Sequence, residues 1–233
     1  MVASGIPSLE PTVQPSQGPS GSPSNVPSQL LSSRQCTDVA REDFEGISSG
    51  SAGWTGASVY TGNATKNFTQ FLGPFGQDQE PIKTFMLPNI NNNVRVQFHF
   101  YQIDSWDESR GRLGPDSFKV FVDDQMVDLG IFSQTDIAGG SGTTSAGIRW
   151  SHFYLDAGVA LADRGFGQWV DMRHKVSLEI PSSFLSSESL VLRFFADLKE
   201  TGCNNNNPCD EEWAGIDNLN ITSCPEGMPF PTV

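Results

Sequence analysis

The stretch Val94-Arg95-Val96-Gln97-Phe98-His99-Phe100-Tyr101 decides the fold class, because apolar and polar side chains alternate along it without interruption. Successive side chains of a β-strand point to opposite faces, so the alternation predicts a strand whose buried face carries Val94, Val96, Phe98 and Phe100. His99 falls on the polar face. Helical periodicity of useful length is absent from the whole sequence, and this absence indicates an all-β protein.

Other segments carry strand signals of the same kind. SFKVFVDDQMVDLGIF (117–132) predicts a hairpin that turns at Asp123-Asp124, and VSLEI (176–180) and SLVLRFFADL (189–198) predict two strands separated by a Pro/Ser turn. AGIDNLNIT (214–222) predicts a final strand. Many short strands with Gly, Asn and Asp turns are typical of a β-sandwich and favour a jelly roll.

The middle of the chain lacks a clear alternation of apolar and polar residues. GGSGTTSAG, from Gly139 to Gly147, is rich in glycine, and we expect it to be an exposed loop and not a strand. Behind it, IRWSHFYLDAG and GFGQWVDMRHKVSLEI supply aromatic side chains that fit a core or a surface equally well.

The N-terminal region differs in composition from the rest. Proline recurs every fourth residue, at positions 7, 11, 15, 19, 23 and 27, and each is followed by Ser or, once, by Thr. A segment so poor in large apolar residues cannot offset its ordering entropy, so we expect a disordered, extended, hydroxyl-rich spacer. The predicted organisation is a spacer at 1–34, a β-sandwich domain at 35–226 and a linker end at 227–233.

Charge excludes one class of partner. The chain has 14 Lys and Arg against 27 Asp and Glu, a net charge of −13, and its cations are scattered, whereas phosphate binding needs them clustered. We therefore expect no nucleic-acid partner. The acidic balance fits a protein that holds divalent cations, and equally one with a merely solvated acidic surface. No run of 18 apolar residues is present, so no membrane span is expected.

The N-terminus of the chain and its cysteines indicate where in or outside the cell the protein is located. MVASGIPSLE has no signal-peptide pattern, so we expect either a trimmed chain or a piece of a longer protein with neighbouring domains. Four cysteines allow three pairings, and we favour Cys36–Cys224 as a clasp of the domain ends and Cys203–Cys209 around a turn-prone loop. Zinc is not expected, because no C-x2-C pair occurs. Three glycosylation sequons fit the secretory route, at Asn63, Asn67 and Asn220.

The proline repeat resembles the spacers of diatom cell-surface and cell-wall-associated proteins, which carry arrays of P-S-x-x-P-S. The match covers about 22 residues of low complexity. It implies an extracellular location, at the cell surface or in the cell wall, and says little about activity.

A second resemblance joins the two ends of the domain. DFEGISSGSAGW (43–54) and EEWAGIDNLNI (211–221) are similar to the first and last strands of calcium-containing jelly-roll domains, including carbohydrate-binding modules. The resemblance implies that one Ca²⁺ is held by Glu45 and Asp217, with Asp43 as a further candidate. Calcium takes six to eight oxygen ligands, which strand-end turns can supply. The alternative is that Asp217-Asn218 only shapes a turn.

FYQIDSWDESRGRLGPDSF contains a second acidic group, formed by Asp104, Asp107 and Asp116. It resembles a D-S-W-D segment that accompanies the first pair in similar surface domains, which implies a metal or ligand contact. The spacing is not that of an EF-hand loop. The competing interpretation is a solvated loop whose carboxylates pair with Arg110 and Arg112.

Five tryptophans are candidates for sugar contacts, because an aromatic face stacks on the apolar patch of a pyranose while nearby polar groups bond its hydroxyls. Trp54 and Trp213 lie in the end motifs and are expected in the core. Trp106, Trp150 and Trp169 lie near loops and are the candidates for a sugar platform. For each of these three, buried packing is the alternative.

The sequence favours a binding protein over an enzyme. It has no G-x-S-x-G, H-E-x-x-H, P-loop or G-x-G-x-x-G motif, and its three His form no visible catalytic pair. We therefore expect a calcium-stabilised carbohydrate-binding module whose partner is a polysaccharide or a glycoprotein glycan. The alternative is an adhesion domain that contacts proteins or cell-wall matrix, and an unrecognised glycoside hydrolase is the minor alternative.

Overall fold

The computed structural model describes residues 35–46, 53–60, 69–76, 78–104, 106, 115–133, 138–155, 171–198 and 212–230. Several predictions fall outside these ranges. They concern the spacer at 1–34, Asp107, Trp169, Asn63, Asn67, Cys203 and Cys209.

The described residues form β-strands and one short 3-10 turn, at Ser182–Phe184. The strands are β1 (Thr37–Glu42), β2 (Val59–Tyr60), β3 (Phe71–Phe75), β4 (Ile82–Met86), β5 (Asn92–Ile103), β6 (Ser117–Val122), β7 (Gln125–Ile131), β8 (Gly140–Thr143), β9 (Arg149–Tyr154), β10 (Met172–Ile180), β11 (Ser189–Asp197) and β12 (Trp213–Pro225). No helix in these ranges is long and apolar enough to cross a membrane.

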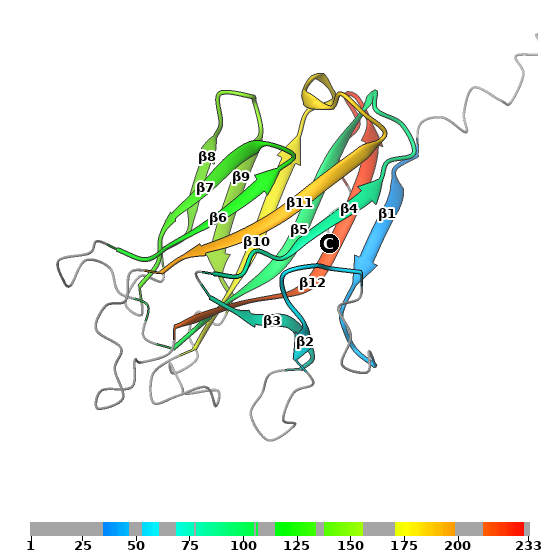
Figure 1. Cartoon of the computed structure of the whole chain (residues 1–233). Coiled ribbons are helices and arrows are strands. Elements are labelled where there is room, and N and C mark those ends of the chain that lie inside the picture. Colours follow the sequence, from blue (N-terminus) through cyan, green and yellow to red (C-terminus); the bar gives the residue numbers. More distant parts are fainter. Residues whose placement is uncertain are drawn as a thin grey trace, which may run out of the picture.

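The strands build two antiparallel sheets that pack as a sandwich (Figure 1). The larger sheet has the order β2-β3-β12-β5-β10-β9-β8, with β1 also paired to β12, and the smaller has the order β4-β11-β6-β7. Strands of the first half pair with strands of the second half in nested fashion: β3 with β12, β4 with β11, β5 with β10, and β6 with β7. This nesting is the jelly-roll arrangement. The all-β, jelly-roll prediction is confirmed.

The core lies between the sheets and follows the predicted alternation. Val94, Val96, Phe98 and Phe100 of β5 are at most 1% exposed and form one cluster with the inward residues of the small sheet. The Phe100 ring stacks on Phe118 of β6 with centroids 4.0 Å apart. Burying each such side chain contributes about 1.5–3 kcal/mol. The predicted hairpin at 117–132 is also confirmed, as β6 and β7 joined at Asp123-Asp124.

The expectation of a loop from Gly139 to Gly147 is wrong in its first half. Gly140–Thr143 is β8, the edge strand of the large sheet, and it pairs with β9. A Cβ at Gly140 or Gly142 would lie 2.5 Å from the His152 ring and 2.9 Å from the Trp150 indole. The glycines therefore give the bulky side chains of β9 room to lie across the edge strand, a use of strand glycine that composition alone does not reveal.

Gly142→Val tests this explanation. We expect it to lower the free energy of unfolding by about 1–3 kcal/mol, because the branched side chain must displace the Trp150 ring. Ser141→Val is the matched control: Ser141 neighbours Gly142 in the same strand and is exposed, so its replacement should change stability by less than about 0.5 kcal/mol. Urea unfolding measures both, and equal effects would contradict a steric role for the glycine.

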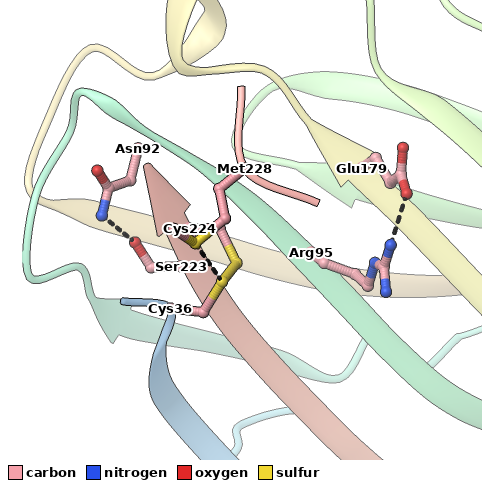
Figure 2. Close-up of a disulfide and its surroundings, with 7 residues drawn as sticks. All are labelled: Cys36, Asn92, Arg95, Glu179, Ser223, Cys224 and Met228. Atoms are coloured by element: carbon pink, nitrogen blue, oxygen red, sulfur yellow. Dashed lines mark hydrogen bonds and ion pairs between the residues drawn. A yellow bond between two sulfur atoms is a disulfide. The ribbon is translucent and has the colours of Figure 1, made fainter. Parts of the chain in front are cut away.

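The two ends of the domain are joined covalently. Cys36, just before β1, forms a disulfide with Cys224 near the end of β12, as predicted (Figure 2). The Met228 sulfur lies 3.6 Å from the Cys36 sulfur, and Asn92 donates a hydrogen bond to the Ser223 hydroxyl beside the bond. Disulfides form and persist in oxidising compartments, so the bond indicates such an environment for this chain.

Candidate functional site

Asp217 lies where β12 departs from regular pairing with β5, at an irregularity between Asp217 and Asn220. Its carboxylate is buried and accepts several hydrogen bonds. Oδ2 accepts from the Tyr101 hydroxyl at 2.7 Å and from the Thr69 hydroxyl at 3.4 Å, and Oδ1 accepts from the Asn218 backbone N–H at 2.7 Å. Asn218 has a φ of 50°, a left-handed conformation that asparagine tolerates better than most residues. Asp217 is thus held in place by its neighbours.

Glu45 reaches the same region from the start of the chain. It follows β1, which pairs with β12, and its Oε1 accepts a hydrogen bond from the Gln70 backbone N–H at 3.1 Å. Since Thr69 and Gln70 are consecutive, the two carboxylates flank a single point before β3. Burial raises the pKa of Asp217 to about 6, and the negative charge of Glu45 acts in the same direction. The structure therefore brings together the two motifs that the sequence paired.

Asp43, the further calcium-ligand candidate, closes the turn in which Glu45 lies. Its side chain is exposed, and Oδ1 accepts a hydrogen bond from the Glu45 backbone N–H at 3.1 Å, which closes a short turn. The first strand itself is Thr37–Glu42, so Asp43 and Glu45 lie in the turn after it and not within a strand. Phe44 between them is fully buried and anchors the turn to the core.

Glu45 and Asp217 supply only part of the ligand set that a calcium ion requires. Two carboxylates whose charges repel each other suit a cation, which would compensate both. However, the described residues contain no group of three His, Cys, Asp or Glu side chains that could hold a metal. Calcium accepts backbone carbonyls and water as ligands, so an ion here would rely on them beyond these two carboxylates.

Two members of the predicted second acidic group, Asp104 and Asp116, lie within the described residues. Asp104 and Asp116 are 3% and 2% exposed, and they form no metal-binding group within the described ranges. Asp104 has a φ of 66°, and its backbone N–H donates to Oδ1 of the buried Asp171 at 3.0 Å. This contact could not be predicted from local sequence, because the pairing of β5 with β10 brings Asp104 and Asp171 together.

The tryptophans do not form a sugar platform in the described part of the chain. Trp106 is 1% exposed and its indole N–H donates to the Trp213 carbonyl oxygen at 3.0 Å, so no face of its ring is open. Trp150 points toward the core and its ring stacks on His152 at an interplanar angle of 8°. Trp54 is buried, as expected. Trp213 is only half-buried, against a small outer cluster of Phe71, Tyr101 and Ile103.

The outer face of the large sheet instead carries rows of polar side chains that run across the strands. Residues paired in antiparallel strands present their side chains on the same face. One row, which runs from β12 to β8, consists of amides and hydroxyls, and every member is half-buried or exposed: Asn220, Gln97, Ser177, Ser151 and Ser141. The sequon residue Asn220 is thus part of this row.

A second row lies two residues along each of β5, β9 and β10. It runs from Asp217 through His99 and Lys175 to Phe153, whose side chain is 50% exposed. Asn218, beside Asp217, is exposed and its Nδ2 lies 3.2 Å from Nδ1 of His99. Three strand spacings separate the ends of the row, about 15 Å. The sequence placed His99 on a polar face correctly, but it could not show that His99, Lys175 and Phe153 are aligned.

The fold and these rows define an all-β sandwich domain of jelly-roll topology with a polar outer sheet face. Comparison of the chain with protein-family models, with curated proteins and with solved structures finds no match.

Proposed function

We propose that this domain is an extracellular carbohydrate-binding module of a cell-surface or cell-wall protein, and that it binds without catalysis. The observation that carries the proposal is the outer face of the large sheet, where a row of amides and hydroxyls lies beside a row that contains the exposed Phe153. Amide and hydroxyl groups donate and accept hydrogen bonds with sugar hydroxyls, and an exposed ring can stack on a pyranose. The Cys36–Cys224 disulfide supports the proposed extracellular location.

In this proposal a calcium ion at Glu45 and Asp217 stabilises the site. When bound, it would neutralise two carboxylates that otherwise repel each other across the turn after β1 and the irregularity of β12. Asn218 and His99 adjoin Asp217, so fixing this carboxylate would also fix one end of the second row. The side chains of the chain itself make the sugar contacts.

A glycan array with Ca²⁺ and with EDTA tests the proposed function. We expect binding to a defined glycan, weaker in EDTA, and loss of binding in Phe153→Ala. Trp150→Phe serves as the control, because Trp150 faces the core and the replacement keeps an aromatic ring there. Absence of any glycan signal, while Ca²⁺ still raises the melting temperature, would reject sugar binding in favour of a structural adhesion domain.

The calcium site has its own test. Ca²⁺ at 100 times its dissociation constant should stabilise the native chain by about 2.7 kcal/mol. Asp217→Asn should abolish this gain, since it removes a ligand charge, whereas Asp128→Asn should leave it intact because Asp128 is an exposed residue of β7. Calorimetric melting of the three proteins measures the effect. No response of the wild-type chain to Ca²⁺ would show that the metal assignment is wrong.

A further inference from the structure

Resting on the proposed function, we propose that the ligand is an anionic polysaccharide that carries carboxylate or sulfate groups. These groups would bind at a basic strip on the outer face of the large sheet, which consists of Arg149, Arg173 and Lys175 from β9 and β10. Arg95 of β5 adjoins the strip, but its side chain is only 18% exposed and its guanidinium lies 4.2 Å from the Phe230 ring. Lys175 lies at its centre, between His99 and Phe153.

Five adjacent strands of this sheet carry a net charge opposite in sign to that of the chain, whereas β1, which pairs with β12, carries two carboxylates and one cation. Across the five adjacent strands β12, β5, β10, β9 and β8, the Lys, Arg, Asp and Glu residues are four cations and two carboxylates, Glu179 and Asp217, so 4 − 2 gives +2. The whole chain has 14 − 27 = −13. Asp217 is moreover 1% exposed. An acidic protein that gathers cations on one sheet face is suited to an anionic ligand there.

Among the described residues, the ion pairs on this face leave Lys175 without a carboxylate partner. Glu179 accepts hydrogen bonds from both Arg95, at 2.9 Å (Figure 2), and Arg149, so one carboxylate serves two guanidinium groups. Lys175 forms no ion pair with any described residue. By contrast, the cations on the outer face of the small sheet are matched one to one: Lys119 pairs with Asp197 at 2.7 Å and Arg193 pairs with Glu80.

The neighbours of Lys175 favour a glycan over an acidic peptide. The half-exposed Phe153 ring lies on one side, and the amide and hydroxyl row of Gln97, Ser177 and Ser151 runs alongside. A polysaccharide offers hydroxyls and apolar ring faces together with its anionic groups, and so engages all of these side chains. A polyanion without hydroxyls would use the cations alone.

The test compares matched polymers by isothermal titration at constant Ca²⁺: dextran sulfate with dextran, and polygalacturonate with its methyl ester. We expect the anionic member of at least one pair to bind at least tenfold more tightly than its neutral partner, and the stronger pair identifies sulfate or carboxylate as the group. Binding should weaken with added salt, because exposed charges are screened. Lys175→Gln should weaken it about tenfold, the value of one charged hydrogen bond, and Lys175→Arg should restore most of it.

Lys119→Gln is the matched control, with the same loss of charge on the opposite sheet, and should leave affinity unchanged. Equal binding of charged and neutral polymers would overturn the inference and leave the proposed function standing. Equal losses in Lys175→Gln and Lys119→Gln, or Lys175-dependent binding of polyglutamate as tight as that of the glycan, would also overturn it. Failure of every glycan on the array, charged or neutral, would instead remove the proposed function itself.

Discussion

Replacing Cys36 and Cys224 together by serine should lower the free energy of unfolding by about 4–5 kcal/mol. The disulfide joins residues separated by 188 positions. Closing so long a loop restricts the unfolded chain strongly, and the chain-entropy relation gives about 5 kcal/mol at 25 °C for this length. Small domains have total stabilities of about 5–15 kcal/mol, so the loss is a large part of what holds the sandwich together.

Urea unfolding of the double variant against the wild-type chain measures the effect. The serine variant is preferable to a reducing agent, because it leaves Cys203 and Cys209 as they are. The native strands should persist in the variant at low denaturant, since β1 remains paired with β12 from Thr37 to Glu42. A loss below about 1 kcal/mol would mean that contacts other than the disulfide already restrain the ends in the unfolded chain.

The sandwich could be predicted because strands of both sheets are marked by local sequence patterns. The alternation of residues 94–101, the hairpin at Asp123-Asp124 and the final strand each depend on local sequence, and each was confirmed. β8 was missed because its glycines serve the Trp150 and His152 rings of another strand. A glycine that is required because a neighbouring strand carries bulky side chains cannot be recognised from the sequence of its own strand.

In the candidate site, the pairing of Glu45 with Asp217 could be predicted from sequence, but the residues on the outer sheet face could not. Glu45 and Asp217 lie at opposite ends of the sequence, and they meet because β1 and β12 are neighbours, which the paired motifs implied. The burial of Trp106 could not be predicted, because loop-like flanking residues do not determine which face a side chain takes. The rows on the outer face depend on the registers of β5, β9 and β10, which the sequence does not state.

His174 should make the domain sensitive to acid. It lies on the inner face of β10 and is 2% exposed, with its ring 5.7 Å from Phe100 and 5.1 Å from Phe132. Nε2 lies 3.3 Å from Oε1 of the buried Gln102. Burial among aromatic rings lowers the pKa of His174 to about 3, and the proximity of His152 acts in the same direction. The side chain is therefore neutral in the folded protein at physiological pH.

The direction of the pH effect follows from the two states. In the unfolded chain a histidine has a pKa of about 6.5 and takes up a proton below that pH. In the folded state His174 takes up a proton only near its pKa of about 3, so between these two pH values protonation favours the unfolded state. Stability is therefore lost as the pH falls from about 6.5 to 3. Each pKa unit corresponds to 1.36 kcal/mol, so His174 alone costs about 3 kcal/mol at pH 4 and about 4 kcal/mol at pH 3, where the folded state also begins to take up the proton.

The measurement is the free energy of unfolding at pH 6.5 and at pH 4, in EDTA, for the wild-type chain and His174→Gln. Glutamine keeps a neutral polar group near Gln102 but cannot take up the proton, so the variant should lose about 3 kcal/mol less than the wild type over this interval. Asp217 acts in the opposite direction, since its pKa is raised to about 6, but it is present in both proteins and cancels in the difference. Equal losses for wild type and His174→Gln would show that His174 is protonated in the folded domain, and would place the acid sensitivity in other groups.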